Sequence, residues 1–570
     1  MYLLNWDTPI IEQLKPIVYG IGNDFGYYGI GKYQSINIEK GSQSTMKKIN
    51  YKKAAVLSAL LLTFGFGTMT YAAQPVSAVT ETQNVVERKA AAEIWPQRIP
   101  HSIDASAFAL PTRGAVIKSV TYVPKKQDAS KAGDYYAVRG SIKPADVKAP
   151  DIEFQLNLPR HWNHKIVQFG GGGFNGTLVT ADGQAAGEGE ELVPPLNQGY
   201  ATFGSDGGHE GTVWDSTWAV NNEALHNFAS DQLKKTKDAA YAIVRAYYGE
   251  KPQRTYFIGG SNGGREALMV TQRYPQDYDG VVSLFPVLNW VPKALKDHEN
   301  TEAVLAQQGS GWISPQTFGV IAKAVTDTAD SLDGKKDGLI ANPYAADAKL
   351  PEINKRLQGK LTPRQAAVWQ QFLTDKKFSP ETQADPYVSV MPGYSVSQLL
   401  IDGDMNQFGS APGKRDGIMT QFSDNVIRYQ IMQDAAFDPD KLDEYRDHAK
   451  IAKAAALLDA TNPDLWAFAQ RGGKMIILHG TADQLVAVKG TVDYVKNLHQ
   501  FMGEEASRNL YRFYLAPGYG HGSGSLFTIS RDLLHDLDQW VTNGTAPEAI
   551  TVRNQNNMKE SQILVPWKEK

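Results

Sequence analysis

The chain contains no cysteine among its 570 residues. This absence excludes disulfide bridges, thiolate metal sites and cysteine nucleophiles. The chain also has no large excess of positive or negative charge. Its 58 basic and 61 acidic residues give a formal net charge of −3, and they form no long blocks of one sign. We therefore expect no basic face for a phosphate backbone, and no nucleic-acid partner.

One long apolar run lies near the N-terminus. Residues 46–53 are basic, residues 54–69 are almost wholly apolar, and small residues follow at Ala72, Ala73, Ser77 and Ala78. This order predicts a signal peptide over residues 46–78, and hence a secreted or periplasmic protein without stable membrane insertion after cleavage. The alternative is an uncleaved anchor, but the run is shorter than the ~20 residues of a spanning helix. Residues 1–45 are then expected to be a non-native or disordered extension.

Composition and length indicate a globular chain with room for one large enzyme domain plus an insertion. Residues 79–93 are expected to be a flexible lead-in. We predict a first part of an α/β domain over residues 94–287, a lid domain over 288–467 and the second part over 468–570. The lid assignment depends on helical segments and Asp/Gly turns with few strand signals.

Apolar or alternating runs predict the strands of a large sheet. Four early runs suit antiparallel entry strands, and a helix with apolar spacing over 233–247 precedes the next strand. An inserted lid would then hang over the carboxyl ends of the strands, where active sites of open α/β folds lie. The predicted strands are 115–123, 135–140, 152–158, 165–169, 255–258, 281–285, 474–479 and 510–515.

Residues 259–264 read Gly-Gly-Ser-Asn-Gly-Gly and contain the only G-x-S-x-G of the chain. A strand-like run precedes this segment and a helix-like run follows it, which is the context of the nucleophile elbow in an α/β-hydrolase. Glycines flank the serine because the turn requires unusual backbone angles and a close approach of strand to helix. Ser261 is therefore a candidate nucleophile. The alternative is a glycine-rich surface turn.

A serine nucleophile needs a base and an acid, and in this fold class they follow in the order Ser, Asp/Glu, His. Asp483 and His521 each come directly after a predicted strand, with room for one helix between the two strands. His479 lies inside a strand, so we interpret it as a packed core residue. His209 precedes the serine in sequence, which makes it a weaker base candidate and a candidate pocket residue.

The oxyanion of an acyl-transfer reaction needs fixed backbone donors, usually the N–H after the nucleophile and one from an earlier loop. Asn262 supplies the first donor. The glycine-rich loop 170–176 follows a predicted strand and fits the second, for which we select Gly172. A phosphate-binding loop is the alternative, but the Lys-Ser/Thr ending and the Rossmann spacing are both missing.

These motifs resemble the tannase and feruloyl esterase family, which also includes mono(hydroxyethyl) terephthalate hydrolase. The resemblance extends from about Trp95 to Trp567 and implies an α/β-hydrolase fold with a lid, a Ser261, Asp483 and His521 triad, and hydrolysis of aromatic-acid esters. Family members commonly carry a disulfide beside the triad, whereas this chain has Gly260 and Gly522 there. The matching segments are 158–165, 170–176, 204–209, 256–266, 273–280, 471–474 and 517–521.

Residues 330–340 combine clustered carboxylates with glycines, a pattern typical of hard cations such as Ca²⁺, although the spacing is not that of an EF-hand. Two Asp-Gly turns in a solvated loop are the alternative. Resemblance to the family's lid calcium loop implies a structural Ca²⁺ without a part in bond cleavage. Its implied ligands are the side chains of Asp330, Asp333 and Asp337 and the carbonyls of Lys335 and Leu339. We expect no organic cofactor.

The motifs thus predict a secreted serine esterase that works through an acyl-enzyme, and the resemblance implies that it acts on esters of hydroxybenzoic or hydroxycinnamic acids. Lid aromatics are expected to form the acid pocket, with Trp290, Phe408, Phe422 and Trp466 as candidates. Another carboxylesterase, of terephthalate monoester or chlorogenate type, and a peptidase remain alternatives. So does a catalytically inactive, calcium-dependent binding protein on the same scaffold.

Overall fold

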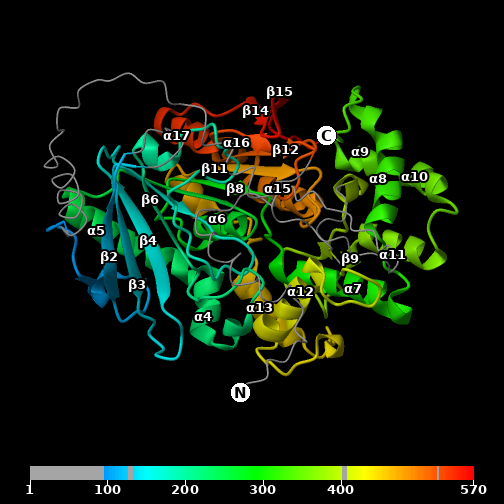
Figure 1. Cartoon of the computed structure of the whole chain (residues 1–570), viewed down its shortest axis with the longest axis horizontal. Coiled ribbons are helices and arrows are strands. Elements are labelled where there is room, and N and C mark those ends of the chain that lie inside the picture. The colour runs from blue at the N-terminus through cyan, green and yellow to red at the C-terminus, as the bar shows by residue number, and fades with distance from the viewer. Residues whose placement is uncertain (1–95, 126–132, 401–406, 408, 523–525, 570) are drawn as a thin grey trace, which may run out of the picture. The chain divides into compact units, whose positions relative to one another are not determined.

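The computed structural model describes residues 96–125, 133–400, 407, 409–522 and 526–569. These residues all fall within one compact unit of the chain (Figure 1). The predicted extension, signal peptide and lead-in all lie outside the described residues. Among the described residues, every helix is too short or too polar to span a lipid bilayer.

A ten-stranded sheet has the order β1-β2-β3-β4-β6-β5-β7-β8-β11-β12. Neighbours from β1 to β6 in this order pair antiparallel, and neighbours from β6 to β12 pair parallel. Three of the four predicted entry strands, β2, β3 and β4, are therefore present and antiparallel. The fourth, residues 165–169, was wrongly assigned to the antiparallel part, because β5 pairs parallel with β6 and β7. The strands are β1 (Ser102–Ile103), β2 (Ala115–Val123), β3 (Tyr135–Ile142), β4 (Ile152–Pro159), β5 (Lys165–Phe169), β6 (Ala201–Ser205), β7 (Arg254–Gly260), β8 (Gly280–Leu284), β11 (Lys474–Gly480) and β12 (Tyr511–Ala516).

Helices cover both faces of the parallel part of the sheet, because its buried strands are apolar on both sides. In β8, Val281 packs in a core with α6 (Asn262–Arg273) and α15 (Val488–Met502), whereas Val282 packs in a core with α17 (Leu533–Asn543). The antiparallel strands pack against α5 (Gln232–Tyr248). Two shorter helices, α4 (Asn222–His226) and α16 (Glu504–Leu510), complete this part.

The insertion between β8 and β11 is mainly helical, as predicted. Its only strands among the described residues are the two-residue β9 (Lys376–Lys377) and β10 (Val390–Met391). In Figure 1 the green helices α8, α9, α10 and α11 lie together, and α7 lies beside the yellow α12. The helices are α7 (Trp290–Gly309), α8 (Pro315–Ala329), α9 (Pro343–Asp347), α10 (Leu350–Leu357), α11 (Pro363–Leu373), α12 (Ile418–Asn425), α13 (His448–Leu458) and α14 (Trp466–Gln470).

Local sequence explains where several lid helices begin. In α11, Thr362 and Gln365 form a reciprocal capping box, and Pro363 occupies the first turn. In α8, the Ser314 side chain caps the helix just before Pro315. Both arrangements satisfy backbone N–H groups that a helix start otherwise leaves without partners.

A three-stranded C-terminal sheet was not predicted. It contains β13 (Ile529–Ser530), β14 (Ile550–Asn554) and β15 (Asn557–Leu564). Seven of the eight side chains of β15 are exposed or half-buried. The strand therefore lacks the apolar alternation by which sequence analysis recognises strands.

Candidate active site

Ser261 occupies a strained turn between β7 and α6. Its φ and ψ are 60° and −122°, outside the regions that a non-glycine residue ordinarily adopts. A Cβ on Gly259 would lie 2.5 Å from the backbone of Gly263, and one on Gly264 would lie 2.5 Å from the carbonyl oxygen of Leu284. The predicted strand, turn and helix are present, and neighbouring backbone explains these glycines.

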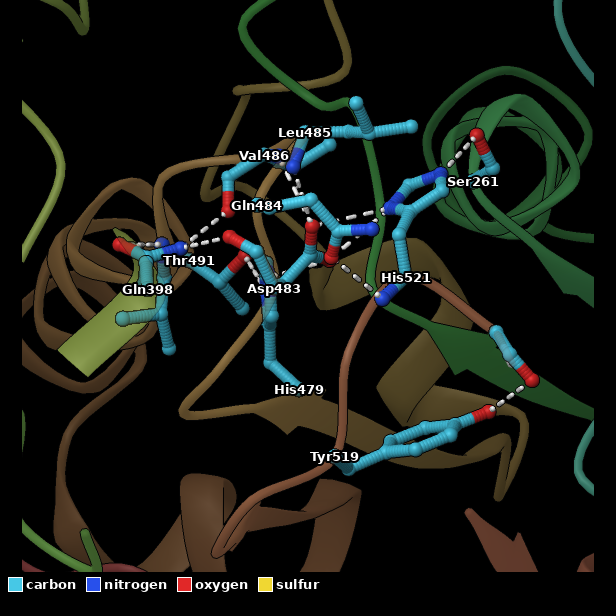
Figure 2. A network of polar contacts seen from close by, with 12 residues as sticks. Ser261, Gln398, His479, Asp483, Gln484, Leu485, Val486, Thr491, Tyr519 and His521 are labelled. Carbon is cyan, nitrogen blue, oxygen red and sulfur yellow. Dashed lines mark hydrogen bonds and ion pairs between the residues drawn. The ribbon is translucent and has the colours of Figure 1, made fainter. Parts of the chain in front are cut away.

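The structure brings Ser261, His521 and Asp483 together at the carboxyl ends of three strands (Figure 2). His521 Nε2 lies 2.8 Å from Ser261 Oγ. On the other side of the imidazole, His521 Nδ1 lies 2.9 and 3.1 Å from the two carboxylate oxygens of Asp483. With Nδ1–H donating to Asp483, Nε2 is left as the acceptor for the serine proton.

Asp483 is fully buried and surrounded by donors. The N–H groups of Leu485 and Val486 each donate to Asp483 Oδ1 over 2.9 Å. Burial by itself would raise the pKa of Asp483, but its electrostatic and hydrogen-bonding interactions with His521 and His479 outweigh burial and hold that pKa well below its ordinary value. The carboxylate therefore stays ionised at neutral pH.

His479 contacts the acid, which its interpretation as a plain core residue did not anticipate. It is fully buried on β11, with Nε2 3.2 Å from Asp483 Oδ2 and Nδ1 2.8 Å from Thr491 Oγ1. The only sequence signal is its position at the end of a strand, four residues before the acid. His479 thus connects Asp483 to α15.

The lid also holds the acid loop. Gln398, in the short helix η6 (Val396–Leu400), donates through Nε2 to the carbonyl of Asp483 and, over 2.7 Å, to that of Val486. Its neighbour Ser397 donates through Oγ to the carbonyl of Thr481 over 2.7 Å. Nothing in the sequence links a glutamine in the lid to an acid 85 residues later.

The loop 170–176 lies beside the elbow, as the oxyanion assignment requires. Gly171 N–H donates to Glu266 Oε2 over 3.0 Å, so that amide is not free for an oxyanion. The amides of Gly172 and Asn262 have no hydrogen-bond partner among the described residues, which fits the selection of these two donors. His209 Nε2 lies 2.6 Å from the Phe174 carbonyl oxygen, whereas the imidazole that contacts Ser261 Oγ is that of His521.

Glu266 joins the loop to the elbow, and sequence analysis gave it no role. Its carboxylate is buried and accepts from Gly171 N–H, from Asn175 Nδ2 over 2.9 Å and from Asn262 Nδ2 over 3.3 Å. Gln232 Nε2 donates over 3.3 Å to Glu266 Oε1, the oxygen that also accepts from Asn175 and Asn262. Burial raises the pKa of Glu266, although Arg265 and the hydrogen bonds from Asn175, Gly171 and Asn262 oppose that shift.

Aromatic lid residues pack against the oxyanion loop. Phe422 stacks on Phe174 at 5.7 Å, and Trp290 contacts both rings edge-on. Their core cluster also includes residues 485–487, which begin two residues after the acid. Trp466 does not belong to this cluster: the side chain is 42% exposed on α14, so its place in the acid pocket stays a prediction. Phe408 lies outside the described residues.

The predicted calcium residues lie in η5 (Asp330–Asp333) and the turn after it. Gly338 N–H donates to Asp330, and Asp333 and Asp337 each accept from the backbone two residues on. The oxygen-only donor set suits a hard cation. However, the three carboxylates do not converge: the only trio of potential ligand side chains within 4.8 Å among the described residues is His298, Glu302 and Asp440.

That trio is already neutralised by a guanidinium. Arg415 forms ion pairs with Glu302 over 3.2 Å and with Asp440 over 2.7 Å. A cation would have to displace this group, so the trio is better explained as part of a surface ion-pair network.

The family model that matches the chain is described as tannase and feruloyl esterase and covers residues 136–570. The chain is 34% identical over 469 residues to an uncharacterized esterase of Agrobacterium fabrum, covering 78% of this chain and 83% of that protein. It is 28% identical over 462 residues to the mono(2-hydroxyethyl) terephthalate hydrolase of Piscinibacter sakaiensis, covering 70% and 74%.

Solved structures of similar fold include feruloyl esterase B from Aspergillus oryzae, with a TM-score of 0.65 at 19% identity over 80% of this chain and 93% of that one. The tannin acyl hydrolase from Aspergillus niger gives the same TM-score and identity over 82% and 93%. At such identities the likeness concerns the fold. It confirms the predicted α/β-hydrolase sheet with an inserted helical lid.

Proposed function

The chain belongs to the tannase and feruloyl esterase family and is a carboxylic ester hydrolase of that type. On this premise we propose that it hydrolyses esters of hydroxybenzoic or hydroxycinnamic acids with Ser261 as nucleophile, His521 as base and Asp483 as its orienting acid. One observation carries the proposal: a single imidazole lies within hydrogen-bond distance of both Ser261 Oγ and a buried carboxylate.

In the proposed reaction, His521 Nε2 takes the Ser261 proton as Oγ attacks the ester carbonyl carbon. The carbonyl oxygen becomes an oxyanion, which the amides of Asn262 and Gly172 stabilise. Collapse of this intermediate breaks the ester C–O bond, and the alcohol leaves with the proton from His521. Water then attacks the acyl-enzyme with His521 as base, and the aromatic acid is released.

The test compares Ser261→Ala with Ser379→Ala, an exposed serine of the lid. We expect Ser261→Ala to lose about 10⁴-fold or more in kcat on methyl ferulate or methyl gallate while its thermal unfolding is unchanged. A fluorophosphonate should label wild type and the control but not Ser261→Ala. Retained turnover in Ser261→Ala would refute the assignment, and an unlabelled, inactive wild type would favour an inactive binding protein on this scaffold.

Aromatic acyl groups are proposed because the lid aromatics Trp290 and Phe422 pack on the oxyanion loop through Phe174. A substrate panel tests this: methyl gallate, methyl ferulate, chlorogenate and a terephthalate monoester, with methyl acetate as control. At least one aromatic ester should exceed the acetate ester in kcat/KM. A preference for acetate would contradict the proposal.

We also propose a structural Ca²⁺ in the loop of Asp330, Asp333 and Asp337. Because the three carboxylates are not gathered, binding would require the loop to close around the ion. Calorimetric titration with Ca²⁺ should give saturable binding that Asp333→Asn/Asp337→Asn abolishes and the exposed control Glu210→Gln retains. Absence of binding heat and of any increase in Tm with Ca²⁺ would overturn this proposal.

Export is proposed from the basic and apolar pattern of residues 46–78. N-terminal sequencing of protein exported by a bacterial host should find a new terminus within residues 72–79. An unprocessed product in the membrane fraction would show an anchor instead.

A further inference from the structure

Phe285 lies directly after β8, in an unusual backbone conformation. Its φ is +35°, one of few positive values at non-glycine residues of the described chain. The backbone around it is tied to two strands, because Phe285 N–H donates to Leu478 O over 2.7 Å and Ser261 N–H donates to Leu284 O over 3.0 Å. Strained residues of this kind persist only where the surroundings enforce them.

The Phe285 ring separates the nucleophile's turn from the histidine loop. It meets the His521 ring edge-on at 4.8 Å between centroids and the Tyr519 ring at 5.8 Å. An ideal Cβ on Gly260, the residue before the nucleophile, would lie 2.5 Å from Phe285 Cζ. An ideal Cβ on Gly522, the residue after the histidine, would lie 3.4 Å from the same atom.

From these contacts we infer that Phe285 is a positioning residue, which keeps His521 aligned with Ser261 by packing between Gly260 and Gly522. The inference depends on the proposed roles of Ser261 and His521. Asp483 fixes Nδ1 of the imidazole, but one hydrogen-bonded edge leaves the ring free to tilt about that edge. The Phe285 ring blocks this tilt. It fits against the nucleophile's turn because Gly260 has no side chain.

The tests are Phe285→Leu and, as a matched control, Phe203→Leu, a fully buried phenylalanine of β6 in another core cluster. Both variants should lose similar thermal stability. Only Phe285→Leu should lose kcat, by about 10- to 100-fold, because small misplacements of a base are costly, while KM stays within about two-fold. An equal kcat in the two variants would overturn the inference.

A rescue experiment distinguishes loss of His521 positioning from a general loss of packing as the cause of a lower kcat. Both ideal Cβ positions lie against the same atom of Phe285, so they are at most about 6 Å apart, a bound that includes the roughly 3.5–4.5 Å between the Cβ atoms of a disulfide. Phe285→Ala/Gly260→Cys/Gly522→Cys, bridged with oxidised glutathione, should regain most of the kcat that Phe285→Ala loses. Since the natural chain has no cysteine, dithiothreitol acts only on this bridge and should abolish the gain.

The outcomes distinguish this inference from the proposed function. A wild type that is folded but hydrolyses none of the esters would contradict the function itself. An active wild type whose bridged triple variant stays as slow as Phe285→Ala would contradict only the role of Phe285. Recovery on oxidation and loss on reduction would establish that role.

Discussion

Glu266→Gln is the most informative substitution in the oxyanion region. Every hydrogen bond to the Glu266 side chain comes from an N–H donor, with Gly171 N–H on one oxygen and the amides of Asn175, Asn262 and Gln232 on the other. An amide side chain must place its own NH₂ against one of these groups. The less damaging orientation faces Gly171 N–H, because it leaves three donors satisfied.

In that orientation the half-buried Gly171 N–H loses its acceptor, which costs up to about 1–3 kcal/mol, the range for a buried donor. Loss of this hydrogen bond changes the position of the loop at Gly171. We therefore expect the neighbouring Gly172 N–H, the proposed oxyanion donor, to move away from the oxyanion. Each 1.4 kcal/mol of transition-state stabilisation corresponds to about ten-fold in rate, and loss of a whole oxyanion donor to about 10²- to 10³-fold. We expect kcat of Glu266→Gln to fall about 10- to 100-fold, with KM nearly unchanged.

The assay is steady-state hydrolysis of methyl ferulate, with Glu188→Gln as the control. Glu188 is another buried carboxylate, but it accepts from Ala185 N–H and from none of the donors that surround Glu266 in the described part of the chain. Wild-type kcat in a folded Glu266→Gln would refute the reasoning. A drop of the same size in Glu188→Gln would also refute it, because the effect would then follow from loss of any buried carboxylate.

Three further predictions concern other buried polar groups. His479→Leu should lower kcat about ten-fold with the fold intact, since Asp483 loses one of its contacts; an unchanged kcat would leave His479 a plain core residue. Burial raises the pKa of Glu188 to about 8, so between pH 4.5 and 8 the unfolded chain ionises while the folded chain stays protonated. Unfolding free energy should therefore fall by up to about 1.4 kcal/mol per pH unit in that window, and urea denaturation should find this loss absent in Glu188→Gln. Arg265→Met should destabilise by about 3 kcal/mol or more in the same assay, because the buried guanidinium donates to the carbonyls of Phe228, Ala229 and Leu458; a smaller loss would contradict this.

Sequence reasoning located the parts of the site that have local signals. Ser261 is recognisable from its glycines, and Asp483 and His521 from their positions after apolar strands. These signals exist because a parallel sheet brings the carboxyl ends of its strands to one edge. The mainly helical insertion was predictable for another reason, its helical segments and Asp/Gly turns with few strand signals. The order of the strands in the sheet was not predicted.

Residues that act through long-range packing gave no such signal. Gln398 reaches the acid loop from the lid, and Phe285 takes its place only once two glycine backbones and the His521 ring surround it. The contact of His479 with Asp483 depends on the turn between them. Glu266 is an ordinary helix residue in sequence, and only folding surrounds its carboxylate with amides.

The hydrogen bonds between the lid and the acid loop limit how this enzyme can be divided. Ser397 and Gln398 provide donors for carbonyls of the acid loop, and Thr481 donates in turn to the Ile340 carbonyl of the lid. Leu339 packs on Gly518, three residues before the base. A chimera that takes its lid from a relative would therefore also need that relative's loops after β11 and β12. The unit that can be exchanged between relatives is thus larger than the insertion itself.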